Sequence, residues 1–272
     1  MSGFPLSVFF VLLGLALFGA IAILPYSFNL NRDKLVQARL SKPVLALISF
    51  VQTAFLMALA TGVGLLAAQP IGLGAPYIRA ALTGGAAPGL FLNLLPIAIG
   101  LGVLSFGAMA LLERFVFAPH VPEVLRNSDV NAKAWMRVLA SFYGGIDEEI
   151  LTRLFLVSGL AWIIGRFWQN ANGLPAAGAF WTAIILAAVF FGLGHLPATR
   201  AVTPLTSMLV IRAVALNGVA AIAFGWLFWR YGLEAAMVAH FSADILLHVI
   251  GPQFITRVYK NAPSMKAPSV LK

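Results

Sequence analysis

The sequence predicts an all-α protein, a polytopic bundle of about seven transmembrane helices with one further amphipathic helix at the membrane interface. Of its 272 residues, 61% are hydrophobic and 10% are charged, and the mean hydropathy is +0.93. Soluble domains are about 45–50% apolar and about 25% charged, so this composition excludes a soluble single domain. It also excludes disorder, which requires low hydrophobicity and high charge. The chain contains no cysteine, which excludes disulfide scaffolds, thiol catalysis and Cys-ligated zinc.

Apolar runs of roughly 18 residues or more, the length that crosses a hydrocarbon core, define the spans. Seven are predicted, at residues 6–25, 43–67, 90–112, 146–165, 177–195, 204–229 and 233–250. We expect residues 1–251 to form a single transmembrane domain, with a catalytic-like core at 145–250. Residues 252–272 contain three prolines and four basic residues, which predicts a basic cytosolic tail.

The basic residues set the orientation of the spans. Thirteen of the eighteen Lys and Arg residues fall in the loops 26–42 and 113–145, at Arg200 and in the tail, whereas three fall on the opposite side. Because Lys and Arg collect on the cytosolic side, we expect the N-terminus outside and the C-terminus in the cytosol. This topology, with anionic lipid at the cytosolic face, accounts for the net charge of +9, so no nucleic-acid partner is expected. Short loops and compact size favour a bacterial inner membrane.

One segment, 129–143, is neither loop nor span. Its apolar residues repeat at i, i+3, i+4 and i+7, and polar residues take the other face. The apolar face carries Trp135, Val138, Leu139 and Phe142, and the polar face carries Lys133, Arg137 and Ser141. This pattern predicts a helix that lies flat in the membrane interface.

Ionisable residues within the spans stand out, because a charge at the bilayer centre costs roughly 2.5–3.5 kcal/mol. They form three groups: Asp147, Glu148 and Glu149 with Arg153 in the fourth span, His195 at the end of the fifth, and His240 with Asp244 in the seventh. Acids that begin a helix also stabilise its free amides and its dipole. However, the alternating spans place the acids and both histidines in the cytosolic half of the membrane. That convergence favours a functional site over helix capping.

The three groups have the spacing of a known set of motifs: Glu148-Glu149-Ile150-Leu151-Thr152-Arg153, Phe191 to His195, and His240 to Asp244. Together and in this order, they resemble the CPBP family of CAAX proteases and bacteriocin-processing enzymes. Its best-known branch is the type II CAAX prenyl endopeptidase. The resemblance covers about 145–250, and the first 110 residues are similar only in being membrane helices.

The resemblance implies a proteolytic site inside the membrane that opens to the cytosol. Glu148 would polarise the attacking water with assistance from His195. Glu149 would pair with Arg153 and hold the helix, an i, i+4 pair that the spacing also favours.

By the same resemblance, His240 and Asp244 would stabilise the oxyanion. The prenyl endopeptidase branch typically has Asn where this chain has Asp244, and an ionised Asp can only accept hydrogen bonds. Either Asp244 is protonated, or it orients and charges His240; we favour the second.

Two mechanisms fit these residues. Glu148, His195 and His240 could supply three ligands to a divalent metal such as zinc, or the acid and the histidines could activate water without a cofactor. We expect an intramembrane endopeptidase acting on a peptide or membrane-protein substrate. The alternatives are a non-catalytic immunity or scaffold protein of the same fold, and a transporter, for which repeat symmetry would be expected.

Other polar residues give weaker signals. Arg212 and Asn217 lie in the sixth span, and Arg212 would either neutralise Glu148 or Asp244 or extend to the cytosolic surface. At the outer surface, the i, i+4 spacing of Arg230 and Glu234 predicts a minor ion pair.

Overall fold

The computed structural model describes residues 3–37, 39–85, 87–126 and 132–251. Within this part of the chain the structure is helical, without a β-strand. Two predictions lie partly or wholly outside the described residues: the basic tail at 252–272 and the first residues of the amphipathic segment.

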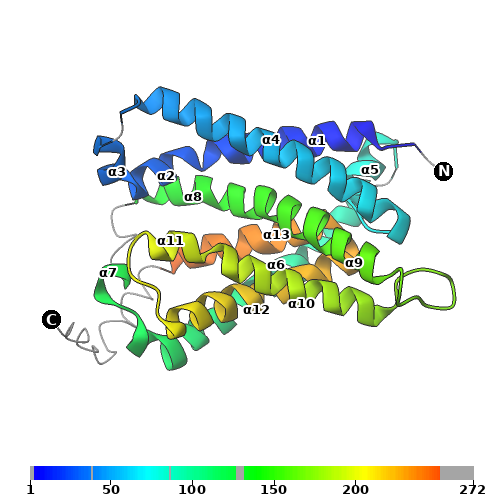
Figure 1. Cartoon of the computed structure of the whole chain (residues 1–272). Helices are drawn as coiled ribbons and strands as arrows, with labels where there is room; N and C mark the ends of the chain where they lie inside the picture. The colour runs from blue at the N-terminus through cyan, green and yellow to red at the C-terminus, as the bar shows by residue number, and fades with distance from the viewer. Residues whose placement is uncertain (1–2, 38, 86, 127–131, 252–272) are drawn as a thin grey trace.

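Figure 1 shows long helices that run side by side, with the N-terminus at the end of the bundle opposite α3, α7 and α11. The elements are α1 (Leu6–Ala22), α2 (Leu24–Leu30), α3 (Arg32–Gln37), α4 (Lys42–Ala68), η1 (Gln69–Ile71), α5 (Pro76–Leu82), α6 (Ala87–Leu112), η2 (Glu113–Phe117), η3 (Ala118–His120), α7 (Glu123–Arg126), α8 (Ala134–Tyr143), η4 (Gly144–Glu148), η5 (Ile150–Val157), α9 (Ser158–Ile164), α10 (Ala177–Gly194), α11 (Leu196–Arg200), α12 (Ser207–Tyr231), α13 (Leu233–Asp244) and η6 (Ile245–Ile250).

Six helical stretches among the described residues are long and apolar enough to cross a membrane. They are Leu6–Leu30, Lys42–Ile71, Gly89–His120, Ala177–Arg200, Ser207–Tyr231 and Leu233–Ile250, and each corresponds to one predicted span. The remaining predicted span, 146–165, is formed by η4, η5 and α9, which continue α8 as one helical run. The acids and the arginine at its start make this run less apolar than the other six.

The amphipathic helix is present as α8, but it continues directly into η4 and the fourth span instead of forming a separate helix, and part of its polar face is buried. Arg137 and Ser141, assigned to the water-facing side, are buried, whereas Trp135 on the apolar side is half exposed. The helix packs against α1, α2 and η6. Part of the polar face therefore points into the bundle, while Phe142 of the apolar face packs on Phe18 of α1 and Phe241 of α13.

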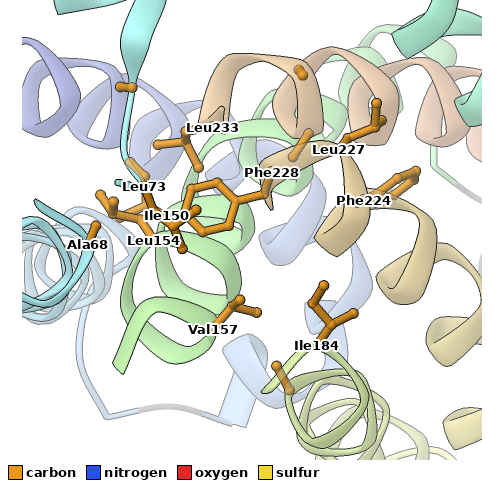
Figure 2. Packing of buried hydrophobic residues seen from close by; sticks show 14 of the residues in the cluster. Ala68, Leu73, Ile150, Leu154, Val157, Ile184, Phe224, Leu227, Phe228 and Leu233 are labelled. Carbon is orange, nitrogen blue, oxygen red and sulfur yellow. The ribbon is translucent and has the colours of Figure 1, made fainter. Parts of the chain in front are cut away.

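The apolar core joins α4, η5, α10, α12 and α13. Figure 2 shows Ile150, Leu154 and Val157 of η5 among Ala68 of α4, Ile184 of α10, Phe224, Leu227 and Phe228 of α12, and Leu233 of α13. All of these side chains are buried. This packing fixes η5, and with it the acids that precede it, against the helices that carry the histidines.

Two glycines bring α10 and α12 into direct contact. Gly192 lies against the backbone of Val214, and Gly225 lies against the side chain of Ile184, without room for a Cβ atom at either glycine. The two contacts run in opposite directions along the chain, so α10 and α12 are antiparallel. This contact sets the level of His195, which directly follows α10, relative to the residues of α12.

Candidate active site

A cavity of about 290 Å³ lies between α2, α6, α8, α10, α12 and α13. All four predicted catalytic residues, Glu148, His195, His240 and Asp244, line it. The other lining residues are Ile23, Tyr26, Met109, Arg137, Ala140, Tyr143, Gly144, Phe191, Asn217, Ala220, Phe224, Ala243, Leu247 and His248. The fold thus brings residues from three separate motifs to one polar cavity.

Behind the cavity, a buried chain of charges holds His240. Arg153 Nη1 lies 3.1 Å from Glu149 Oε1, which confirms the predicted ion pair. The same Oε1 lies 2.6 Å from Nδ1 of His240. Because a paired carboxylate can only accept, Nδ1–H donates to Glu149, and Nε2 faces the cavity.

Arg153 is 1% exposed, and its surroundings compensate for burial of the cation. Its guanidinium lies 5.5 Å from the ring centre of Phe191 and 5.6 Å from that of Phe224. It also donates to the carbonyl of Ala221 at 3.2 Å and to the hydroxyl of Thr152. These contacts, with the carboxylate of Glu149, satisfy a charge that would otherwise be very costly to bury.

The three consecutive acids have different surroundings. Glu148 reaches the cavity, where its Oε2 lies 3.8 Å from Nε2 of His240, and a quarter of its side chain is exposed. Asp147 is fully buried against Gly19 of α1, and neither of its carboxylate oxygens has a hydrogen-bond partner among the described residues. Only Glu148 of the three is thus open to a substrate or water in the cavity.

His195 is oriented by its own helix. Its Nδ1 lies 2.8 Å from the carbonyl of Phe191, and a carbonyl can only accept. The neutral imidazole therefore carries its proton on Nδ1, which leaves a lone pair on Nε2. That arrangement suits a group that accepts a hydrogen bond from water.

Asp244 does not make the orienting bond to His240 that we expected of it. Its Oδ1 is 3.7 Å from Nε2 of His240 and 4.0 Å from Nε2 of His248, beyond a hydrogen bond in both cases. The other carboxylate oxygen lies against Gly144, where a Cβ atom would have no room. The hydrogen bond that orients His240 is made with Glu149, and Asp244 lies on the cavity side of the imidazole.

Two weaker predictions concern residues outside the motifs. Arg212 pairs with Glu113 of η2, with Nε 2.7 Å from Oε2, an ion pair that the sequence did not predict. Glu234 is buried and accepts a hydrogen bond from the backbone N–H of Ile78 at 2.7 Å, in place of an ion pair with Arg230. The carboxylates of Glu113 and Glu234 therefore both contact residues that are distant in the sequence.

Glu148, His195 and His240 are the candidate ligands for zinc. Among the described residues, no three His, Asp or Glu side chains are placed so that they could hold a metal ion together. Glu148, His195 and His240 share the cavity but do not form such a group as they stand.

Several cavity residues have no motif in the sequence. Tyr26 and Tyr143 carry hydroxyl groups into the lining, and Arg137 donates to the backbone carbonyl of His248 at 3.1 Å. In the sequence, Asn217 is distinguished only as a single amide side chain within an apolar span. Arg137 had an indirect signal, because the amphipathic pattern marked its face as polar.

Acids and histidines thus surround one cavity within a bundle of helices that are long and apolar enough to cross a membrane. Residues 130–246 match the family model for Rce1-like type II CAAX prenyl endopeptidases. No curated protein and no solved structure matches the chain. The matched segment contains all three motifs, so the family resemblance is confirmed there, and it supports a membrane endopeptidase in general.

Proposed function

We propose that the protein is an intramembrane endopeptidase that hydrolyses a peptide bond near the cytosolic face of a bacterial inner membrane. The main support for this proposal is that the two adjacent glutamates have different surroundings. Glu149 is bound to Arg153 by an ion pair and to His240 by a hydrogen bond, whereas the side chain of Glu148 lines the cavity. A peptide or a membrane protein with an extended segment would be the substrate.

The reaction is a general-base hydrolysis. Glu148 takes a proton from a water molecule that Nε2 of His195 helps to hold, and the water oxygen attacks the carbonyl carbon. The carbonyl electrons move to its oxygen, and His240 stabilises that charge. Glu149 and Asp244 on either side of the imidazole favour its doubly protonated form, so that Nε2–H can donate. When the C–N bond breaks, Glu148 returns its proton to the amine nitrogen.

The test compares two adjacent acids that differ in their access to the cavity. Glu148→Gln preserves size but removes the base, so turnover should fall by roughly 10²–10⁴-fold. Asp147→Asn is the matched control and should retain activity, because Asp147 faces Gly19 and does not line the cavity. The readout is mass spectrometry of new protein termini in membranes from cells that express each variant.

Fragments present with wild type and Asp147→Asn but missing with Glu148→Gln would support the proposal and identify the substrate. Identical fragments in all three, with full biological function of Glu148→Gln, would contradict it. That result would favour the non-catalytic immunity or scaffold protein.

A further inference from the structure

The proposed hydrolysis places negative charge on the carbonyl oxygen of the substrate, and that oxygen needs hydrogen-bond donors. The carboxylates of Glu148 and Asp244 are acceptors. Nδ1–H of His195 is already bonded to the carbonyl of Phe191, so its Nε2 is an acceptor as well. Of the motif residues that line the cavity, His240 alone offers a donor, and oxyanion sites usually combine two or more.

We propose that Asn217, on α12, is a further catalytic residue that donates the second hydrogen bond to this oxygen. The inference rests on the proposed endopeptidase function and deepens it. Asn217 lines the cavity together with Glu148 and His195. It lies on a different helix from every motif residue, so α12 forms a side of the cavity to which the motifs contribute no residue.

The level of Asn217 in the bundle follows from two backbone contacts. Side chains on a helix lean toward its N-terminus, and Nδ2 of Asn217 donates to the carbonyl of Ala213, one turn back, at 2.8 Å. The imidazole of His195 leans back one turn on α10 in the same way. Between them, Gly192 packs on Val214 and on the Ala213 carbonyl. The amide and the imidazole therefore lie at one level on two adjacent antiparallel helices.

The amide nitrogen has the capacity for this role, because it carries two hydrogens. One is bonded to the carbonyl of Ala213, and no second hydrogen bond of this amide occurs among the described residues. The bond to Ala213 also fixes the orientation of the amide. A donor held in place before the reaction stabilises a developing charge more effectively than a mobile one.

The step conserves its protons. Attack by water forms the C–O bond, the proton of the water passes to Glu148, and the carbonyl electrons become the oxyanion. Asn217 donates to that oxyanion without releasing its proton. As the C–N bond breaks, Glu148 protonates the amine. Because the interaction is stronger with the oxyanion than with the carbonyl, loss of Asn217 should lower kcat and leave KM almost unchanged.

The test uses proteoliposomes and two quenched fluorescent peptides, one ending in a prenylated Cys-aliphatic-aliphatic-X sequence and its unprenylated counterpart. The variants are Asn217→Leu, which is similar in size and compatible with the membrane, and Asn217→Asp, which keeps the shape but replaces the donor. Both should lower kcat by about 10²–10³-fold. KM and thermal stability should remain close to those of the wild type.

A double-mutant cycle separates catalysis from structure. Asp244→Asn introduces a second amide donor into the cavity, on α13. In the Asp244→Asn background, the fold-loss of kcat caused by Asn217→Leu should be at least about tenfold smaller than in the wild type. The reason is that the new amide would supply part of the hydrogen bonding to the oxyanion. Two independent structural effects would simply add.

Normal kcat in Asn217→Leu beside an inactive Glu148→Gln would overturn this inference and leave the proposed function intact. Additive losses that follow thermal stability would overturn it too. So would a loss in Tyr143→Phe that the Asn217 variants do not share, since the donor would then be the phenol. If the wild type cleaves neither peptide, and membrane fragments are unchanged in Glu148→Gln, the proposed function itself is contradicted.

Discussion

Asp147, Glu148 and Glu149 are neighbours in the chain, yet each has a different environment. A helix turns about 100° per residue, so three consecutive side chains point in three directions. One points toward α1, one toward the cavity, and one toward Arg153 and His240. The position of each acid around the helix, more than its residue type, decides whether it can act on a substrate.

The buried position of Arg153 leads to a prediction about folding. Arg153→Ala leaves Glu149 as a buried carboxylate without its cation, which should destabilise the protein by about 3–5 kcal/mol. The yield of folded protein in the membrane and its melting temperature should therefore fall further than in Glu148→Gln. Arg114→Ala, at an exposed arginine that lies over Phe115, is the matched control and should behave like the wild type. Equal yields of all three variants would count against a structural role.

The donor set leads to a prediction about cofactors. Since Glu148, His195 and His240 do not form a three-ligand group as placed, we expect the purified protein to contain no stoichiometric zinc. Incubation with a chelator should leave peptide cleavage unchanged, and added zinc should not raise it. Loss of activity on chelation, with recovery on zinc addition and loss of bound metal in each of the three variants, would establish the metal mechanism instead.

Among individual residues, the sequence predicts the contacts that depend on local spacing along a helix. The pair of Glu149 and Arg153 follows from i, i+4 geometry, and the sequence predicted it. The bond between Glu149 and His240 joins residues 91 positions apart, and the pair of Arg212 and Glu113 joins residues 99 positions apart. Such partners depend on how helices pack, which spacing alone does not determine.

Among the elements, the site coincides with departures from regular α-helix. Wider, π-type turns form η4, which contains Glu148, η5, which contains Arg153, and η6, which directly follows Asp244. Such turns rotate side chains away from the regular 3.6-residue period and are frequent at functional sites. No sequence pattern used above predicts these turns, because a single extra residue in a helical turn leaves the apolar run of a span unbroken.

The amphipathic segment shows the limit of periodicity. A 3.6-residue pattern establishes that α8 has two faces, and this part of the prediction is correct. It does not establish which face is buried. In water the apolar face turns inward, but beside lipid a polar residue can turn toward an internal cavity, as Arg137 does here.

The contact between η4 and α13 leads to a prediction at this scale. In Gly144→Ala the new methyl group would collide with the carboxylate of Asp244, so η4 and α13 must separate or Asp244 must move. Displacement of catalytic groups by about 1 Å can cost roughly 10²-fold in rate, and we expect a loss of that order in kcat. Gly107→Ala on α6, where a Cβ atom meets no neighbour, is the control and should keep full activity. Equal activities would show that the site tolerates the shift.

Across the whole molecule, the basic residues sort by the ends of the bundle. Figure 1 places α3, α7 and α11 at one end, and these helices contain Arg32, Arg126 and Arg200. The opposite end carries α5, with Arg79, and the loop after α9, with Arg166. The charge asymmetry read from the sequence is therefore also an asymmetry in space, although which end faces the cytosol stays a prediction.

That orientation can be tested with reporter fusions. Because most Lys and Arg residues should remain in the cytosol, reporters inserted after residue 35 and after residue 265 should both give a cytosolic signal. A reporter after residue 84, next to α5, should give a signal from the other side and serves as the control for export. The cavity is lined by Tyr26, Arg137 and His248, from elements at the end that carries α3. A periplasmic signal at residue 35 would therefore show that the predicted orientation is wrong. The proposed site would then open to the periplasm, where a cytosolic substrate could not reach it.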